Sequence, residues 1–401
     1  MSNADPIVIT GMARTPMGGF LGDLKDARAA DLGAAAIRAA VARSGIAPET
    51  VGETLFGCVL PAGQGQAPAR QAALGAGLSL ASGATTVNKM CGSGMKAAML
   101  AHDLLIAGSA DVAVAGGMEA MSRAPYLMER AREGLRMGHD RVIDHMFLDG
   151  LEDAYERDEK GGGRLMGTFA EDCAEAYGFT REAQDDFAIA SLTRAQQAIE
   201  SGAFDAEVTP VTVTGRRGDT TVATDEQPGK ARIDKIPHLR PAFRAGGTVT
   251  AANSSSISDG AAALMLMRLS EAERRGLTPL AALRGHTTFA DKPTLFPTAP
   301  IGALRLLQQK TGWAPGDVDL FELNEAFAVV ALAAMRDLDL PHDKVNVHGG
   351  ACALGHPIGA SGARILVTLL AALQRHELKR GVAAICIGGG EATAMAIERL
   401  T

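Results

Sequence analysis

The sequence predicts an α/β fold made of two similar halves, with a further region inserted in the first half. Apolar residues make up 47% of the 401 residues and charged residues 21%, which is enough for a large core. Strand-like and helix-like segments alternate in the first and last thirds, and this alternation is typical of βαβ units. A helix followed by a strand that runs into glycines occurs twice, which indicates an internal repeat.

Hydrophobic periodicity places the individual elements. In the first third we expect strands at residues 7–10, 53–60, 85–88 and 111–115, and helices at 31–44 and 95–107. In the last third we expect strands at 318–323, 344–347 and 382–387, and helices at 325–336 and 361–374.

The repeat relates these two thirds. Ser93 opens a helix, and the strand after that helix reaches Gly116; Ser361 and Gly388 occupy the same places in the second copy. The second copy is four residues longer, and the turn at 375–381 can hold them. Chance similarity between glycine-rich turns is the alternative.

Residues 118–248 differ from both copies, because they are rich in charge and methionine and contain a polar helix at 181–201. We interpret this region as an inserted loop domain that covers a site or contacts other subunits; an ordinary peripheral helical domain is the alternative. The predicted division is therefore 1–118 with 249–275 as the first half, 119–248 as the insertion, and 276–401 as the second half.

Composition excludes several classes of protein. A net charge of −7 argues against a nucleic-acid coat, and the sequence has neither a secretory signal nor an apolar run of membrane-spanning length. The five cysteines contain no Cys-x-x-Cys pair, which argues against a disulfide framework or a structural zinc site and favours reduced thiols in the cytoplasm. Phosphate-binding and dinucleotide-binding glycine motifs are also absent.

Cys91 is a candidate nucleophile. It lies between an expected strand and an expected helix, in the run Cys91-Gly92-Ser93-Gly94. Unpaired N–H groups and the helix dipole would lower the pKa of a thiol there and favour the thiolate. A buried cysteine that only fills space is the alternative.

His356 is a candidate base, because it lies in a glycine-dense loop that a ligand can approach before the helix at 361–374. Cys386 ends an apolar strand next to Gly388, and it is a candidate acid or base beside exposed backbone N–H groups. The alternatives are a turn histidine bonded to backbone and a core cysteine.

Asn324 follows the strand at 318–323. It can cap the next helix, or it can hold a water or polarise a carbonyl at the strand end, where such sheets bind ligands.

Together these segments resemble the thiolase family. The resemblance rests on residues 88–96, 324–328, 355–364 and 386–391, and it extends over nearly the whole chain through 13–16, 116–119, 239–243 and 247–253. It implies the layered αβαβα fold of that family, in which the two halves stack and a loop domain interrupts the first. Within the family the pattern is most similar to the members that act on acetyl-CoA.

The resemblance also implies roles. Cys91 would carry the acyl group, His356 would activate it and donate to one oxyanion with a water held by Asn324, and Cys386 would move the α-carbon proton. The N–H groups of Cys91 and Gly388 would form the second oxyanion hole. The reaction would join two acetyl-CoA into acetoacetyl-CoA and CoA by ping-pong transfer, without a metal or redox cofactor.

Coenzyme A contacts are expected, on the same resemblance, from Leu151, Met166, Phe243, Ala251, Ser255, Ala326 and Phe327. Three departures from the family pattern bear on chain-length preference: Leu165 replaces a frequent histidine, His348 replaces a frequent asparagine, and Lys230 or Arg232 would substitute for an arginine near the nucleotide.

Residues 121–138 resemble the tetramerisation loop of bacterial-type thiolases, so we expect a homotetramer. Two alternatives remain at this point. One is a thiolase for longer 3-ketoacyl-CoA, and the other is a non-catalytic acyl-CoA or lipid-binding relative, against which both cysteines argue.

Overall fold

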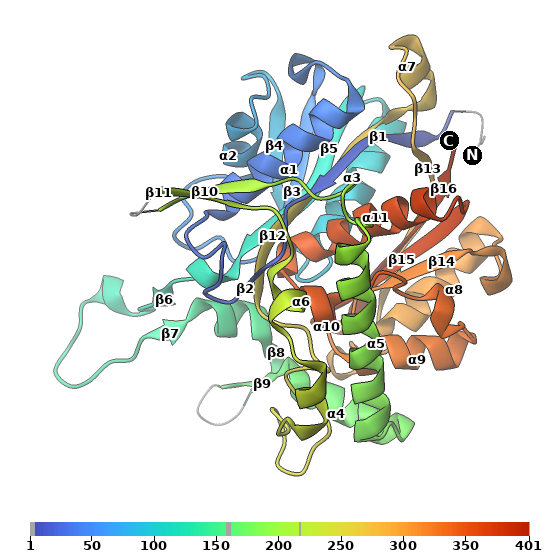
Figure 1. Ribbon diagram of the computed structural model, residues 1–401. Helices are drawn as coiled ribbons and strands as arrows, with labels where there is room; N and C mark the ends of the chain where they lie inside the picture. The colour runs from blue at the N-terminus through green and yellow to red at the C-terminus, as the bar shows by residue number, and fades with distance from the viewer. Residues whose placement is uncertain (1–4, 158–161, 216–217, 401) are drawn as a thin grey trace.

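Ten strands form one mixed sheet in the computed structural model, which describes residues 5–157, 162–215 and 218–400 (Figure 1). The order across the sheet is β14-β15-β16-β13-β1-β12-β5-β3-β4, and β2 pairs with β12. These strands are β1 (Ile7–Arg14), β2 (Gly18–Gly19), β3 (Glu53–Gly57), β4 (Gly83–Val87), β5 (Val112–Ala120), β12 (Ser258–Arg268), β13 (Ala281–Ala290), β14 (Leu320–Leu323), β15 (Arg380–Ile387) and β16 (Glu391–Arg399).

The two halves of the sheet repeat one pairing pattern. In the first half β3 is parallel to β5, β5 is antiparallel to β12, and β12 is antiparallel to β1. In the second half β14 is parallel to β15, β15 is antiparallel to β16, and β16 is antiparallel to β13. The halves join where Val8 and Ile9 of β1 pair with β13. The internal repeat inferred from Ser93 and Ser361 is therefore a repeat of structure.

Helices form three layers around the two halves of the sheet. They are α1 (Ala29–Ser44), α2 (Pro68–Gly75), α3 (Ser93–Ala107), α4 (Met166–Tyr177), α5 (Arg181–Glu200), α6 (Glu226–Lys230), α7 (Leu269–Arg274), α8 (Ala299–Thr311), α9 (Ala328–Leu338), α10 (Ala351–Leu354) and α11 (Ile358–Arg375). The outer faces are covered by α1 and α2 on the first half and by α8 and α9 on the second.

The central layer is formed by α3 and α11, which pack on each other between the sheet halves. A Cβ atom on Gly94 would lie 2.8 Å from the backbone nitrogen of Ala363, so only glycine allows this close crossing. All residues of α11 from Ile358 to Leu373 are buried. The resulting αβαβα layering is the predicted fold class.

Several predicted elements have different bounds. The strand expected at 111–115 is β5, which continues through Gly116 and Gly117 to Ala120, and the strand expected at 53–60 ends at Gly57. The helix expected at 325–336 begins only at Ala328.

The strand expected at 344–347 is wrong, because only Val345 forms a bridge, to Phe321. Asn346 has φ 50, in the left-handed region, so the backbone cannot continue as a strand. Its side chain takes over the pairing, accepting from Leu323 N at 2.8 Å and donating to Leu323 O at 2.8 Å. Apolar periodicity does not detect this replacement of a backbone ladder by a side-chain amide.

Residues 119–248 contain α4, α5 and α6 and three small hairpins: β6 (Tyr126–Leu127) with β7 (Ile143–Asp144), β8 (Glu152–Arg157) with β9 (Gly163–Leu165), and β10 (Val211–Gly215) with β11 (Gly218–Val222). The β6–β7 hairpin projects away from the layers (Figure 1). The predicted polar helix is α5. The boundaries at 118, 248 and 275 stay predictions.

Buried charges attach this region to the sheet. Arg14, at the end of β1, is fully buried and donates from Nε to Glu207 Oε1 at 2.5 Å. Its other nitrogens form a two-pronged contact with Asp225 at 2.7 and 2.8 Å. Such paired geometry offsets the cost of burying the ions. In the described part of the chain, each helix is too short or too polar to cross a membrane.

Candidate active site

Both halves of the fold and the inserted region line one cavity of about 370 Å³. Four predicted catalytic residues line this cavity: Cys91, His356, Cys386 and Gly388. The predicted coenzyme A contacts line it as well: Leu151, Met166, Phe243, Ala251, Ser255, Ala326 and Phe327. The structure thus brings together residues that lie up to almost 300 positions apart in the sequence. Their chemical roles stay predictions.

Cys91 lies on the turn between β4 and α3, two residues before the helix starts. Ser93 holds this turn, because its hydroxyl donates to Met90 O at 2.6 Å and accepts from Lys89 N at 2.8 Å. Met90 itself has φ 45, a left-handed conformation that a non-glycine residue adopts only when neighbours enforce it. The turn therefore presents Cys91 to the cavity in a fixed orientation.

Burial changes the expected protonation of Cys91. It raises the pKa of the thiol to about 11, although the N–H groups of Gly388 and Cys91 act in the opposite direction. The predicted lowering of this pKa is therefore wrong for the free site: the helix starts beyond the thiol, and desolvation outweighs two N–H donors. Cys91 is a thiol at neutral pH, so nucleophilic attack needs a base to accept its proton.

His356 lies in the loop between α10 and α11 and is buried. Its backbone N–H is held by Ser256 O at 3.1 Å and by Ser258 Oγ at 3.2 Å. Burial lowers the pKa of the imidazole to about 3, so the ring is neutral. A neutral ring carries one bare nitrogen, and only that nitrogen can act as a base.

Ser361, to which no sequence pattern gave a role in the site, contacts one of the two ring nitrogens, Nδ1. Ser361 Oγ lies 3.0 Å from Pro357 O and 2.5 Å from His356 Nδ1; we assign the single hydroxyl proton to Pro357 O, so that the oxygen accepts from Nδ1. The proton is thus on Nδ1, and Nε2 holds the lone pair. Within the described residues Nε2 is buried without a hydrogen-bond partner, which leaves it available to the cavity.

Cys386 and Gly388 lie where β15 ends, next to the Cys91 turn. Gly92 packs so closely there that a Cβ on it would lie 2.4 Å from Ile387 Cδ1. Burial raises the pKa of Cys386 well above its ordinary value, and the nearby Cys91 adds to this effect. Two neutral thiols and a neutral imidazole therefore open on one cavity, next to the N–H of Gly388.

Asn324 is fully buried between β14 and α9, and it is the predicted catalytic residue that the structure does not place among those lining the described cavity. The helix-capping alternative is wrong, because the residue before α9 is Phe327. Among the residues that the structure describes, neither Asn324 Oδ1 nor Nδ2 has a hydrogen-bond partner. An unpaired buried amide is costly unless it binds water or a ligand, which fits the expected water-holding role.

An apolar wall faces these groups. Phe243 and Phe327 pack edge to face with ring centroids 5.9 Å apart, and Phe243 lies directly over Gly167. A Cβ on Gly167 would approach the Phe243 ring to 2.3 Å, so this backbone position must stay a glycine for the ring to sit there. Leu165, one of the three departures from the family pattern, also lines the cavity.

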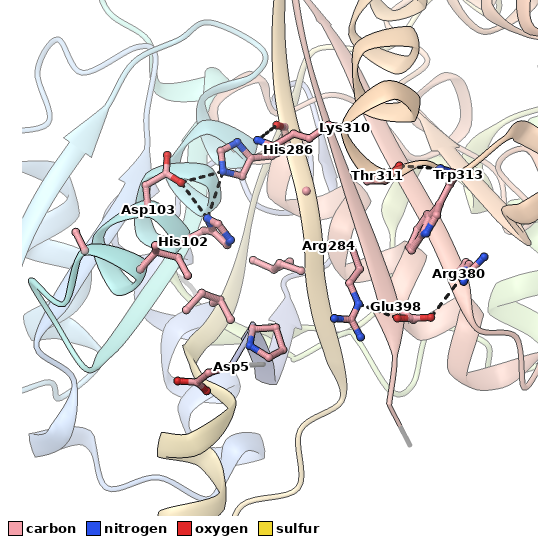
Figure 2. Close-up of a pocket in the computed structure, with 16 residues that line it drawn as sticks. Asp5, His102, Asp103, Arg284, His286, Lys310, Thr311, Trp313, Arg380 and Glu398 are labelled. Carbon is pink, nitrogen blue, oxygen red and sulfur yellow. Dashed lines mark hydrogen bonds and ion pairs between the residues drawn. The ribbon is translucent and has the colours of Figure 1, made fainter. Parts of the chain in front are cut away.

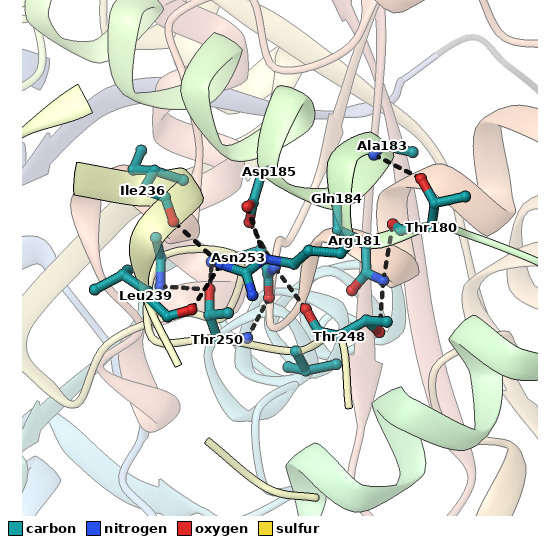
Figure 3. Close-up of polar contacts among 12 residues, drawn as sticks. Thr180, Arg181, Ala183, Gln184, Asp185, Ile236, Leu239, Thr248, Thr250 and Asn253 are labelled. Carbon is teal, nitrogen blue, oxygen red and sulfur yellow. Dashed lines mark hydrogen bonds and ion pairs between the residues drawn. The ribbon is translucent and has the colours of Figure 1, made fainter. Parts of the chain in front are cut away.

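Polar contacts fix the segment at 248–255, which carries Ala251 and Ser255. Figure 3 shows the contacts of Thr248, Thr250 and Asn253 in this segment. Gln184 donates to Thr248 Oγ1 at 2.9 Å, and Asn253 donates to Asp185 Oδ1 at 3.0 Å. Gln184 and Asp185 lie on α5, which belongs to the inserted region. This region therefore positions part of the cavity wall.

Glu119 is a second residue whose importance only the structure reveals. It is fully buried at the end of β5 and accepts N–H groups from Val59 at 2.9 Å, Leu60 at 3.2 Å and Gly359 at 2.9 Å. One carboxylate thus joins the loop after β3 to the start of α11, which follows His356. Burial raises the pKa of Glu119 to about 7.

The other two departures lie outside the cavity lining. His348 contacts His376, with the two Nε2 atoms 3.2 Å apart, and burial lowers the pKa of His348 to about 4. Lys230 is exposed and pairs with Glu226 and Asp23.

Comparisons with known proteins find similarity over nearly the whole chain. Residues 7–270 match the family model described as "Thiolase, N-terminal domain", and residues 277–399 match "Thiolase, C-terminal domain". The chain is 47% identical to the acetyl-CoA acetyltransferase of Cupriavidus necator (98% of this chain and 99% of that one) and 49% identical to acetyl-CoA acetyltransferase 2 of Arabidopsis thaliana (99% and 98%). The crystal structure of the Bacillus anthracis acetyl-CoA acetyltransferase superposes with a TM-score of 0.95 at 40% identity, covering all of both chains.

Proposed function

The chain belongs to the thiolase family, and we propose that it acts as an acetyl-CoA acetyltransferase in which Cys91, His356 and Cys386 carry out the chemistry. The observation that carries the proposal is the meeting of these three side chains and the Gly388 N–H at one cavity. The net reaction joins two acetyl-CoA into acetoacetyl-CoA and CoA, and it also runs in reverse.

In the first half-reaction, His356 Nε2 takes the proton of Cys91 as the sulfur attacks the thioester carbon of acetyl-CoA. Proton transfer accompanies attack, because burial holds the thiol pKa at about 11 and the imidazole neutral. The N–H groups of Cys91 and Gly388 face the sulfur, so they can stabilise the oxyanion that forms on the adjacent carbonyl. The C–S bond to coenzyme A breaks, the leaving thiolate takes the proton from His356, and Cys91 is left acetylated.

In the second half-reaction, Cys386 first gives its thiol proton to His356 Nε2, and the resulting thiolate removes a proton from the methyl group of a second acetyl-CoA. His356, together with a water on Asn324, stabilises the enolate oxygen. The carbanion attacks the acetyl group on Cys91, the carbon–carbon bond forms, the bond from the acetyl carbon to the Cys91 sulfur breaks, and that sulfur takes the proton held by His356. Cys91 is occupied by the acetyl group during this step, so the base must be a second group, and Cys386 is that group.

Intact-protein mass after brief incubation with acetyl-CoA tests the proposal. The wild type should gain one acetyl group, and Cys91→Ala should gain none. Cys386→Ala should still gain the acetyl group but should not form acetoacetyl-CoA. Cys173→Ala, which removes a buried thiol on α4 outside the cavity lining, is the matched control and should behave as wild type.

Other results of this experiment would indicate a different activity for the protein. Adducts that form faster as the acyl chain lengthens would indicate a thiolase for longer 3-ketoacyl-CoA, for which Leu165 in the cavity wall would be a reason. The absence of adducts from every acyl-CoA tested would indicate a non-catalytic acyl-CoA-binding relative.

We also propose a homotetramer in the cytoplasm. The support for assembly is the β6–β7 arm, on which Tyr126, Leu135, Met137 and Val142 are more than half exposed. Apolar side chains on a projecting hairpin need a partner surface. Light scattering at assay concentration should give four chains, and a monomer would contradict this. For the compartment, the support is five free thiols, two of them at the cavity, and cell fractionation tests it.

A further inference from the structure

Figure 2 shows a cluster of two histidines and one aspartate. The cavity next to it shares no lining residue with the cavity that holds Cys91. His102 and Asp103 are on α3, and His286 is on β13. They line a separate cavity of about 780 Å³, which also contacts the start of β1 and the end of α8. His102 is nine residues along α3 from Ser93, which corresponds to about 14 Å of helix, so the two sites are at opposite parts of α3.

The spacing of the three ligand atoms is that of a metal site. His102 Nδ1 and Asp103 Oδ1 are 2.9 Å apart, His286 Nε2 and Asp103 Oδ1 are 3.0 Å apart, and the two nitrogens are 3.3 Å apart. A tetrahedral zinc ion with bonds of about 2.0–2.1 Å holds its ligand atoms about 3.3 Å from one another. The cluster therefore provides three corners of such a tetrahedron with little adjustment.

We propose that His102, Asp103 and His286 bind one divalent transition-metal ion of the Zn²⁺ type, which links α3 to β13. The geometry would leave the fourth coordination position to water from the 780 Å³ cavity. Two imidazoles with one carboxylate select Zn²⁺, Co²⁺, Ni²⁺ or Cu²⁺ over Mg²⁺ and Ca²⁺, which prefer oxygen ligands.

Burial and charge around the cluster fit this assignment. The side chains of His286 and His102 are only 11% and 20% exposed, whereas that of Asp103 is 57% exposed, so an ion can enter from the carboxylate side. The rings meet edge to face with centroids 4.9 Å apart. The neighbouring cation Lys310 donates to the His286 carbonyl at 3.0 Å.

The alternative is a hydrogen-bonded cluster in which Asp103 accepts from both imidazoles. Both arrangements use the same three atoms, so only a titration separates them. Because Cys91 can also bind a soft metal, the experiment uses the full-length Cys91→Ala chain, stripped of metal. Co²⁺ is the probe, since its visible absorption reports four-coordinate geometry and its near-ultraviolet absorption reports thiolate ligands; Zn²⁺ then competes for the site.

We expect one equivalent of Co²⁺, four-coordinate bands without a thiolate band, and displacement by Zn²⁺. His286→Gln should weaken binding at least about 100-fold, because loss of an outer-shell partner alone costs 10- to 100-fold. His238→Gln, which removes an exposed histidine, is the matched control and should bind as its parent does. Asp103→Asn provides a second variant at an exposed position, should His286→Gln fail to fold. Equal binding by the parent and the cluster variants, no binding, or a thiolate band would each overturn the proposal.

Discussion

Replacing Ser361 by alanine should impair the reaction by removing the acceptor that fixes the tautomer of His356. Ser361 Oγ lies 3.0 Å from Pro357 O and 2.5 Å from His356 Nδ1, and in the tautomer assigned above it accepts the Nδ1–H. Alanine leaves a buried N–H without a partner. The ring can relieve this only by rotating or by moving the proton to Nε2, and both changes remove the base from the cavity.

The size of the effect follows from the cost of an unpaired buried donor, which is about 1–3 kcal/mol. Since about 1.4 kcal/mol corresponds to a factor of ten, kcat/KM should fall about 5- to 150-fold. The expected loss lies in the acetyl-transfer half-reaction, because His356 takes the Cys91 proton there.

The assay is thiolysis of acetoacetyl-CoA by CoA, together with the rate of acetyl-adduct formation by intact mass. Thr368→Val is the matched control, because it removes another buried hydroxyl from α11, one that contacts Glu207 at 3.3 Å and not His356. We expect this control to stay within about twofold of wild type. A folded Ser361→Ala enzyme with unchanged kcat/KM would refute the assigned tautomer.

Four further predictions follow from burial and pairing at the site. The acetyl-transfer rate should stay constant between pH 5.5 and pH 8, because burial lowers the pKa of His356 from 6.5 to about 3 and the base is therefore unprotonated throughout this range. A rate that falls below a midpoint near pH 6.5 would contradict this prediction. Alkylation of Cys91 by iodoacetamide should keep rising with pH beyond pH 9, because burial raises the thiol pKa to about 11; a plateau near pH 7 would argue for a resting thiolate. Glu119→Gln should lower the free energy of unfolding, measured by denaturant titration, by about 1–3 kcal/mol. The reason is that the new amide NH₂ group would face a backbone N–H that now donates to the carboxylate. Glu133→Gln on the exposed arm is the control and should leave the free energy of unfolding unchanged. Asn324→Leu should leave the melting temperature unchanged or raised, since the amide has no hydrogen-bond partner among the described residues, and yet should reduce condensation; a variant that is fully active would remove Asn324 from the mechanism.

The local pattern of apolar and polar residues was sufficient to predict most helices and strands of the fold. Strand and helix periodicity is carried by neighbouring residues, so β1, α1, α3, α5 and β15 were expected within a few residues of their observed bounds. The pattern failed where a side chain replaced backbone, as at Asn346, and where a strand ran through glycines, as at Gly116 and Gly117. Neither feature has a periodic signature.

For the site, the residue types and their glycine-rich surroundings identified Cys91, His356, Cys386 and Gly388, and the cavity brings these four together. The sequence by itself thus determined which reactive groups are present and the order in which they follow one another. Their protonation was decided only in the tertiary structure, because desolvation and hydrogen-bond partners come from segments far apart in the chain. The Gly388 N–H that faces Cys91 and the burial that raises the pKa of that thiol exist only after both halves have packed. The same packing places His286 beside His102 and Asp103.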